Sequence, residues 1–148
     1  MNEKPSGSVW LFGCCFGRFW WERCCTAAGG VKLIRGSDVA IEFHTNAAVS
    51  KAATGIEALS TLKNKRWCQV LSKAVAKATG WKLRGEDGFK PDNAGQHSRL
   101  AYAQAGGIVF EPFFISNDTD LALFKTTKWG ICRAIADAVA VELGAAKV

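Results

Sequence analysis

Two apolar segments, each carrying a side chain suited to chemistry, constrain this chain more than any other feature. Residues 38–44 predict a buried strand that ends on His44, and residues 108–115 predict a second buried strand with Glu111 inside it. An ionised carboxylate is costly to bury unless it is paired, hydrogen-bonded or close to a metal. We therefore interpret Glu111 as part of a site, and His44 as the residue that would hold a cation beside it.

The surrounding pattern predicts alternating strands and helices. Apolar residues recur at helical spacing over residues 65–79, where Gly80 marks the expected end of a helix, and again over residues 127–143. A further strand is expected over residues 54–60. Strands that read as continuous apolar runs and alternate with helices predict an α/β fold with a mostly parallel sheet flanked by helices. In such sheets the site lies beyond the carboxyl ends of the strands, which is where His44 falls.

These two residues suggest hydrolysis as the chemistry of the site. A neutral imidazole is a natural zinc ligand, and a catalytic zinc takes about three protein ligands and leaves a position for water. A nearby carboxylate can accept the proton of that water and pass it to a leaving nitrogen, which makes amide hydrolysis the natural outcome. Plainer alternatives stay open. His44 would then be a hydrogen-bonded structural residue, and Glu111 the buried partner of an arginine such as Arg84 or Arg99.

Three further residues are candidates to bind a substrate. His97 follows a polar loop expected over residues 84–96, and loops of this kind often carry function. Arg84 and Arg99 are suited to bidentate contacts with the carboxylates of a peptide. The alternative for all three is a solvated or hydrogen-bonded place on the surface.

The charge and length of the chain limit its partners and its location. The 148 residues carry a net charge of +6, spread along the chain, and suit a single domain that binds nucleic acid, anionic lipid or an anionic cell-wall polymer. No basic-aromatic recognition motif is present, so nucleic acid is not an expected partner. No apolar run reaches the roughly 18 residues of a transmembrane segment, and the amino end lacks the pattern of a secretory signal. We expect a monomer that is cytoplasmic in the producing cell.

Residues 1–27 differ in character from the rest. Residues 9–25 concentrate cysteine and tryptophan without helical or alternating order, so no regular element is expected there. We therefore divide the chain into an irregular segment, 1–27, and an α/β domain, 28–148. The adjacent cysteine pairs of the segment are candidate zinc ligands, although they lack the two-residue gap of common zinc sites. A mixture of Trp and Arg would also suit a segment that perturbs membranes.

Three motifs in order carry a resemblance to a known family. Residues 39–46 (VAIEFHTN), 54–57 (TGIE) and 108–117 (IVFEPFFISN) resemble the zinc-dependent N-acetylmuramoyl-L-alanine amidases called amidase 3. They are especially similar to compact phage endolysins, and the likeness runs from about residue 28 to residue 138. It implies that a zinc-activated water hydrolyses the bond between the lactyl group of muramic acid and the first L-alanine of peptidoglycan. In that reaction His44 matches a zinc-binding histidine and Glu111 the catalytic glutamate.

The resemblance also implies that the zinc site is incomplete. The family supplies one ligand from a Gly-His pair after its first strand and another from a glutamate that opens its first helix. No histidine precedes His44, and neither Glu22 nor Glu42, which we expect to point away from His44, stands in the family's context. An aberrant start over residues 1–27 is one explanation, and replacement by cysteine ligands is the other. We expect weak zinc binding and an impaired amidase that meets the cell wall after release, or a non-catalytic cell-wall-binding remnant of one.

Overall fold

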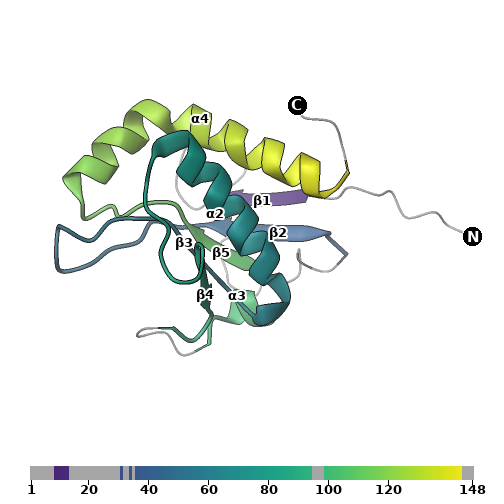
Figure 1. Ribbon diagram of the computed structural model, residues 1–148. Helices are drawn as coiled ribbons and strands as arrows, with labels where there is room; N and C mark the ends of the chain where they lie inside the picture. Colours follow the sequence, from purple (N-terminus) through teal and green to yellow (C-terminus); the bar gives the residue numbers. More distant parts are fainter. Residues whose placement is uncertain (1–8, 14–30, 32–33, 35, 95–98, 145–148) are drawn as a thin grey trace, which may run out of the picture.

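The computed structural model describes residues 9–13, 31, 34, 36–94 and 99–144 (Figure 1). One sheet runs through this part of the chain, and its strands follow the order β1-β2-β5-β3-β4. The strands are β1 (Val9–Gly13), β2 (Val39–Phe43), β3 (Glu57–Ser60), β4 (Phe89–Pro91) and β5 (Ile108–Glu111). The helices are the 3-10 turn η1 (Leu62–Asn64) and the α-helices α2 (Lys65–Thr79), α3 (Ala101–Gln104) and α4 (Asp118–Glu142).

The sheet is mixed, and the expectation of a mostly parallel sheet is wrong. Strands β1, β2 and β5 run parallel to one another, whereas β3 is antiparallel to β5 and carries β4 in parallel on its other side. Residues 44–56 join β2 to β3 without a helix, so the chain does not make the helical crossover typical of a parallel neighbour. A continuous apolar run indicates burial on both faces but not strand direction, which is why the sequence did not reveal this reversal.

Strand β1 lies within the segment for which no regular element was expected. It pairs in parallel with β2, from Val9 beside Val39 to Gly13 beside Phe43. The expectation for residues 9–25 is therefore wrong at residues 9–13, where five apolar or small residues are too few for a period to be recognised. Residues 14–30 lie outside the described part, so the rest of the segment and the boundary at residue 27 stay predictions.

The two long helices cover one face of the sheet. Ile41, Ile108 and Phe110 pack on this face with apolar side chains of the helices, including Leu71 of α2 and Ile135 of α4. Helices α2 and α4 contact each other and lie side by side over the strands (Figure 1). This layer forms the larger hydrophobic core and leaves the opposite face of the sheet to a smaller one.

The smaller core brings α3 against the sheet. Ala40 of β2, Val109 of β5 and Leu59 of β3 pack there with Tyr102 of α3 and with Ile34. Because side chains alternate along a strand, the residues two positions further along share the face of Ala40 and Val109. Glu42 near the end of β2, His44 just after it and Glu111 at the end of β5 therefore lie on the face that α3 partly covers, whereas Phe43 packs on the opposite face.

The helix ends follow local signals. Helix α2 spans residues 65–79 as predicted and ends at Gly80, whose φ of 77° is the left-handed conformation that glycine adopts readily. Helix α4 begins at Asp118 rather than at residue 127, because the side chain of Asn117 accepts hydrogen bonds from two backbone N–H groups of the first turn. Within the described ranges, no helix combines the length and apolar character that crossing a membrane requires.

Candidate active site

The two residues singled out from the sequence lie side by side at one edge of the sheet. Phe43 of β2 pairs with Phe110 of β5, so the next positions along these parallel strands are His44 and Glu111. The backbone N–H of His44 donates to the carbonyl of Phe110 at 2.9 Å, which continues the ladder by one residue. Glu111 ends β5 because Pro112 has no N–H with which to extend it. Both residues thus occupy the carboxyl ends of their strands, although Glu111 was expected inside a longer one.

A second glutamate faces Glu111 across the sheet. Strand β3 begins with Glu57, which is the antiparallel partner of Glu111. Since β3 runs in the opposite direction, its amino end meets the carboxyl ends of β2 and β5 at the same edge. Like charges directly opposite each other destabilise a pair of strands unless other groups compensate. The site therefore needs groups that separate or neutralise these two carboxylates.

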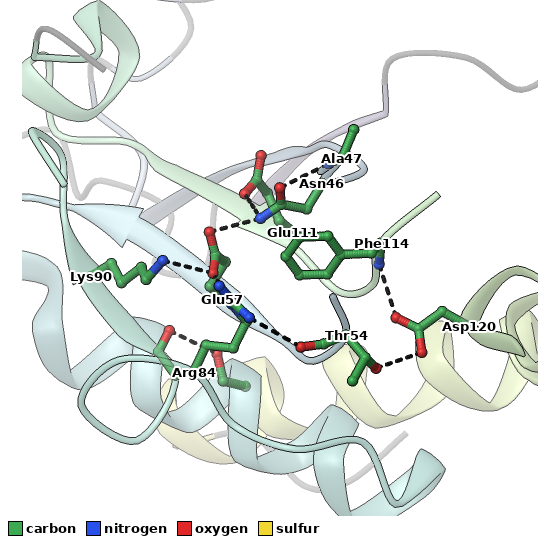
Figure 2. A network of polar contacts seen from close by, with 11 residues as sticks. Asn46, Ala47, Thr54, Glu57, Arg84, Lys90, Glu111, Phe114 and Asp120 are labelled. Atoms are coloured by element: carbon green, nitrogen blue, oxygen red, sulfur yellow. Dashed lines mark hydrogen bonds and ion pairs between the residues drawn. The ribbon is translucent and has the colours of Figure 1, made fainter. Parts of the chain in front are cut away.

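Asn46 lies between the two carboxylates. Its side-chain nitrogen Nδ2 donates to Glu57 Oε1 at 2.7 Å and to Glu111 Oε2 at 2.9 Å. Its oxygen Oδ1 accepts the backbone N–H of Ala47 at 2.8 Å. Figure 2 shows the amide of Asn46 placed between the side chains of Glu57 and Glu111. One side-chain amide thus connects the β3 and β5 carboxylates.

Two cations bind the other oxygen of Glu57. Arg84 Nε donates to Glu57 Oε2 at 2.5 Å, and Lys90 Nζ lies 2.9 Å from the same oxygen. The side chain of the glutamate they hold is 6% exposed, so it is one of the few buried charges among the described residues. Arg84 also donates to the carbonyl of Thr54 at 3.2 Å and lies over the ring of Phe114, 4.8 Å from its centroid (Figure 2). The negative charge of Glu57 is thereby balanced by two cations at Oε2, while Asn46 donates a hydrogen bond to Oε1.

The surroundings lower the pKa of Glu57 and raise the pKa of Glu111. Burial acts to raise the pKa of Glu57, but the bonds and charges of Lys90 and Arg84 outweigh it and hold that pKa below its ordinary value. Burial raises the pKa of Glu111 to about 7, and the negative charge of Glu57 adds to this effect, whereas the positive charge of protonated His44 opposes it. Such a pair contains one carboxylate that stays ionised and one that can exchange a proton near neutral pH.

His44 has a carboxylate neighbour of its own. Its Nε2 lies 3.4 Å from Glu42 Oε1, and 42% of its side chain is exposed. The expectation that Glu42 points away from His44 is wrong, because residues two apart on a strand share a face. The hydrogen bond with Glu42 raises the pKa of His44, burial acts against it, and the charges of Glu42 and Glu111 act with it.

Of the three residues predicted to bind substrate, the described part of the structure places only Arg84 in the site. Arg84 joins the site, but through Glu57 rather than through Glu111, so the alternative that Arg84 is the buried partner of Glu111 is wrong. Arg99 is exposed and precedes α3. His97 lies outside the described residues, and its substrate contact stays a prediction, as do those of Arg84 and Arg99.

Three residues of the network were not predicted as site residues. Asn46 and Glu57 stand inside the motifs at residues 39–46 and 54–57, so their joint occurrence with Glu111 was a usable signal. Lys90 had no such signal, because its position depends on the short strand β4, which the sequence pattern did not indicate. A loop was expected over residues 84–96, but Lys90 pairs there with Leu59 of β3.

The described residues do not by themselves make a zinc site. Among them, no three side chains of His, Cys, Asp or Glu converge closely enough to hold a metal ion. His44 supplies one imidazole, whereas a catalytic zinc takes about three protein ligands. The cysteines at positions 14, 15, 24 and 25 and Glu22 fall outside the described part, so their role as ligands stays a prediction.

Comparison with protein families identifies the class to which this site belongs. The profile of a family described as N-acetylmuramoyl-L-alanine amidase, amidase 3, matches residues 26–141. This range contains the three motifs and every described residue of the network. None of the curated proteins with which the chain was compared matches it.

Solved structures share the fold. A candidate N-acetylmuramoyl-L-alanine amidase from Neisseria meningitidis is 91% identical, with 82% of this chain and 66% of that one covered and a TM-score of 0.77. The catalytic domain of CwlV, an N-acetylmuramoyl-L-alanine amidase from Bacillus (Paenibacillus) polymyxa var. colistinus, is 23% identical over 79% of this chain and 65% of its own, with a TM-score of 0.62.

A third structure is the catalytic domain of the CD27L endolysin targeting Clostridia difficile. It is 24% identical over 76% of this chain and 57% of its own, with a TM-score of 0.55. The likeness to CwlV and to CD27L shows the fold alone. The chain spans just under two thirds of the length of the Neisseria and CwlV structures and a smaller share of the endolysin domain.

Proposed function

The chain belongs to the N-acetylmuramoyl-L-alanine amidase family, amidase 3, and we propose that it hydrolyses the amide between muramic acid and L-alanine in peptidoglycan. The observation that carries this proposal is the placement of Glu111. Its carboxylate stands at the carboxyl end of β5, beside His44 and opposite a glutamate that two cations hold ionised. A carboxylate whose pKa is raised to about 7 is suited to accept and return a proton at neutral pH.

In this proposal Glu111 is the general base and then the general acid. The ionised carboxylate takes a proton from a water molecule as the water oxygen bonds to the carbonyl carbon of the lactyl group. The bond between that carbon and the alanine nitrogen then breaks, and Glu111 passes the proton to the departing amine. The products are a free lactyl carboxylate and a peptide with a free amino terminus. Glu57 and Asn46 do not take part in proton transfer in this scheme.

We propose that zinc is the metal of this family site and that His44 is one of its ligands. When bound, zinc would activate water and polarise the carbonyl group. The described residues offer only one imidazole and no three-ligand cluster, so we propose weak binding unless residues of segment 1–27 add ligands. Low turnover would follow from the same cause.

Digestion of purified peptidoglycan tests the proposal. We expect the full chain, supplied with zinc, to release peptides with free amino-terminal L-alanine, identified by mass spectrometry. His44→Ala should lower both zinc content and turnover. Cleavage at a different bond, or His44→Ala turnover equal to that of the parent, would contradict the assignment.

A second candidate is a non-catalytic protein that binds the cell wall. The lack of a three-ligand cluster among the described residues favours it, and a net charge of +6 suits anionic wall polymers. Such a protein would sediment with peptidoglycan yet release no amino termini, with or without added zinc. Turnover above that of a boiled sample would exclude it.

We also propose a setting for this activity. By its resemblance to compact phage endolysins, the chain would be a monomer made in the cytoplasm that reaches the cell wall after release. Cell fractionation before and after lysis checks the location. The protein in the membrane fraction of intact cells would contradict it.

A further inference from the structure

Both hydrogens of the Asn46 side-chain amide are used in hydrogen bonds within the site. Its NH2 group has two hydrogens, and it donates one to Glu57 at 2.7 Å and one to Glu111 at 2.9 Å. The two glutamates are strand partners, so their carboxylates would repel each other if nothing lay between them. Hydrogen bonds to ionised groups are stronger than those between neutral groups. Asn46 therefore donates to both carboxylates at one edge of the sheet, in addition to the direct hydrogen bond that protonated Glu111 makes with Glu57.

The surroundings of Asn46 fix the direction of this amide. Its Oδ1 accepts the N–H of Ala47, so a flipped amide would turn an oxygen toward the carboxylates and an NH2 toward another donor. Its backbone N–H donates to the carbonyl of Phe113 at 3.0 Å, and its carbonyl accepts from Ile115 at 2.8 Å. The backbone of Asn46 is thus tied to the loop that follows β5, and the side chain has one orientation that satisfies every partner.

Glu57 gives this connection a rigid base. Arg84 and Lys90 bind its Oε2, which leaves Oε1 for Asn46. Glu57 is buried, and its strand is an inner strand of the sheet, between β5 and the edge strand β4. Because the two cations hold Glu57 in place, its Oε1 is a fixed acceptor for Asn46. The amide of Asn46 is then fixed as well, and it holds the carboxylate of Glu111 in one position.

We propose that Asn46 is a positioning residue for the reaction, which holds the carboxylate of Glu111 at a set distance and direction from Glu57. This inference rests on the proposed amidase function, in which Glu111 must face the reacting water within hydrogen-bond reach. Asn46 does not touch the reacting atoms in this proposal. Its contribution is the orientation of the base, so its loss should lower the rate of the chemical step and leave substrate binding unchanged.

Two substitutions of Asn46 and one matched control test the proposal by kinetics. Asn46→Ala removes the donor, and Asn46→Asp keeps the size and the Oδ1 acceptor while replacing the donor by an acceptor. Thr54→Val removes a 2.6 Å side-chain hydrogen bond to Asp120 that involves none of Asn46, Glu57 and Glu111 (Figure 2). We expect both Asn46 variants to lower kcat by roughly 10- to 100-fold with KM within about twofold, and Thr54→Val to keep kcat per folded molecule. An Asn46→Ala variant whose kcat equals that of the parent, or falls no further than that of Thr54→Val, would overturn the proposal.

A second measurement decides the geometry without relying on turnover. In the nitrogen-15 spectrum of the full chain, the side-chain amide signals of Asn46 are those that vanish in Asn46→Asp. We expect Glu111→Gln to shift these signals and Thr54→Val to leave them in place. Signals that do not respond to Glu111→Gln would show that Asn46 does not hold Glu111, and the inference would fail. A parent without turnover whose Asn46 signals do respond would instead refute the proposed function and uphold the placement of Asn46.

Discussion

The site contains two glutamates that the fold treats in opposite ways. Glu57 and Glu111 are strand partners, yet only Glu57 has an arginine and a lysine on its carboxylate. Glu111 has the side-chain amide of Asn46 and the carboxylate of Glu57 as its hydrogen-bond partners, and it lies close to the negative charge of Glu57. The consequence at the residue scale is a base prepared for proton transfer, and it has a cost in stability.

The cost can be measured as a pH dependence of folding. The pKa of Glu111 rises from 4.5 to about 7 on folding, so the folded state binds more protons than the unfolded state between these values. The free energy of unfolding therefore falls as pH rises from about 4.5 to 7 because of this group. We expect Glu111→Gln to be more stable than the parent by about 1–3 kcal/mol at pH 8, after allowance for solvent screening, with the difference vanishing near pH 4.5.

Denaturant titrations at the two pH values check this prediction. Glu86→Gln is the control, because Glu86 is exposed and pairs with Lys65 at the surface. Its effect should stay below about 1 kcal/mol at both pH values. A Glu111→Gln variant that is less stable than the parent at pH 8 would contradict the raised pKa.

The two cations on Glu57 should differ in their contribution to stability. Arg84→Met leaves Lys90 as the one cation on Glu57, removes the bond to the carbonyl of Thr54 and removes the cation from the ring of Phe114. We expect it to lower the free energy of unfolding by about 2–4 kcal/mol. Lys90→Met removes one ion pair and should cost about 1–2 kcal/mol. Equal losses would mean that the additional contacts of Arg84 contribute nothing.

Burial of charge was the most informative signal at this scale. It indicated from the sequence that Glu111 needs partners, and the structure provides Asn46 and the neighbouring His44. It did not indicate which glutamate Arg84 would bind. That choice depends on β3 lying antiparallel to β5, which brings Glu57 to the same edge, and no local pattern near Arg84 encodes a pairing so distant in sequence.

At the scale of elements, the position of a glycine in a helix should decide whether its replacement by alanine lowers or raises stability. Gly80 ends α2 with a φ of 77°, and Gly130 lies inside α4. An added Cβ would meet no atom within 4 Å at either position. Gly80→Ala should therefore cost about 1 kcal/mol from backbone strain alone, whereas Gly130→Ala should stabilise by up to about 1 kcal/mol. Thermal unfolding of the two variants measures both effects, and a stabilising Gly80→Ala would contradict the left-handed cap.

Strong local signals made some elements predictable and others not. Helix α2 combines an apolar stripe with a glycine cap, and both of its bounds were predicted. Helix α4 starts earlier than the predicted residue 127 because the Asn117 cap begins the helix, and Leu121, Leu123 and Phe124 then pack against the larger core. Strands β1 and β4 are short and gain their stability from pairing with β2 and β3, so they lack a period of their own.

At the scale of the whole molecule, the zinc content of the protein reports how many ligands the chain supplies. We expect the purified full chain to contain well below one zinc per molecule, since the described residues contain no three-ligand cluster. Elemental analysis with protein quantification measures this ratio. Near-stoichiometric zinc that disappears when Cys14, Cys15, Cys24 and Cys25 are replaced by serine would contradict weak binding and locate the missing ligands in segment 1–27.

The most direct measurement is the release of amino termini from peptidoglycan by the parent and by Glu111→Gln, with zinc supplied to both. Glu42→Gln is the matched control, because Glu42 shares the face and contacts His44 but is not the proposed base. We predict slow release by the parent and by Glu42→Gln, and none by Glu111→Gln, with zinc content unchanged by the loss of Glu111. Release by Glu111→Gln at the rate of the parent would contradict the role of Glu111 as the base.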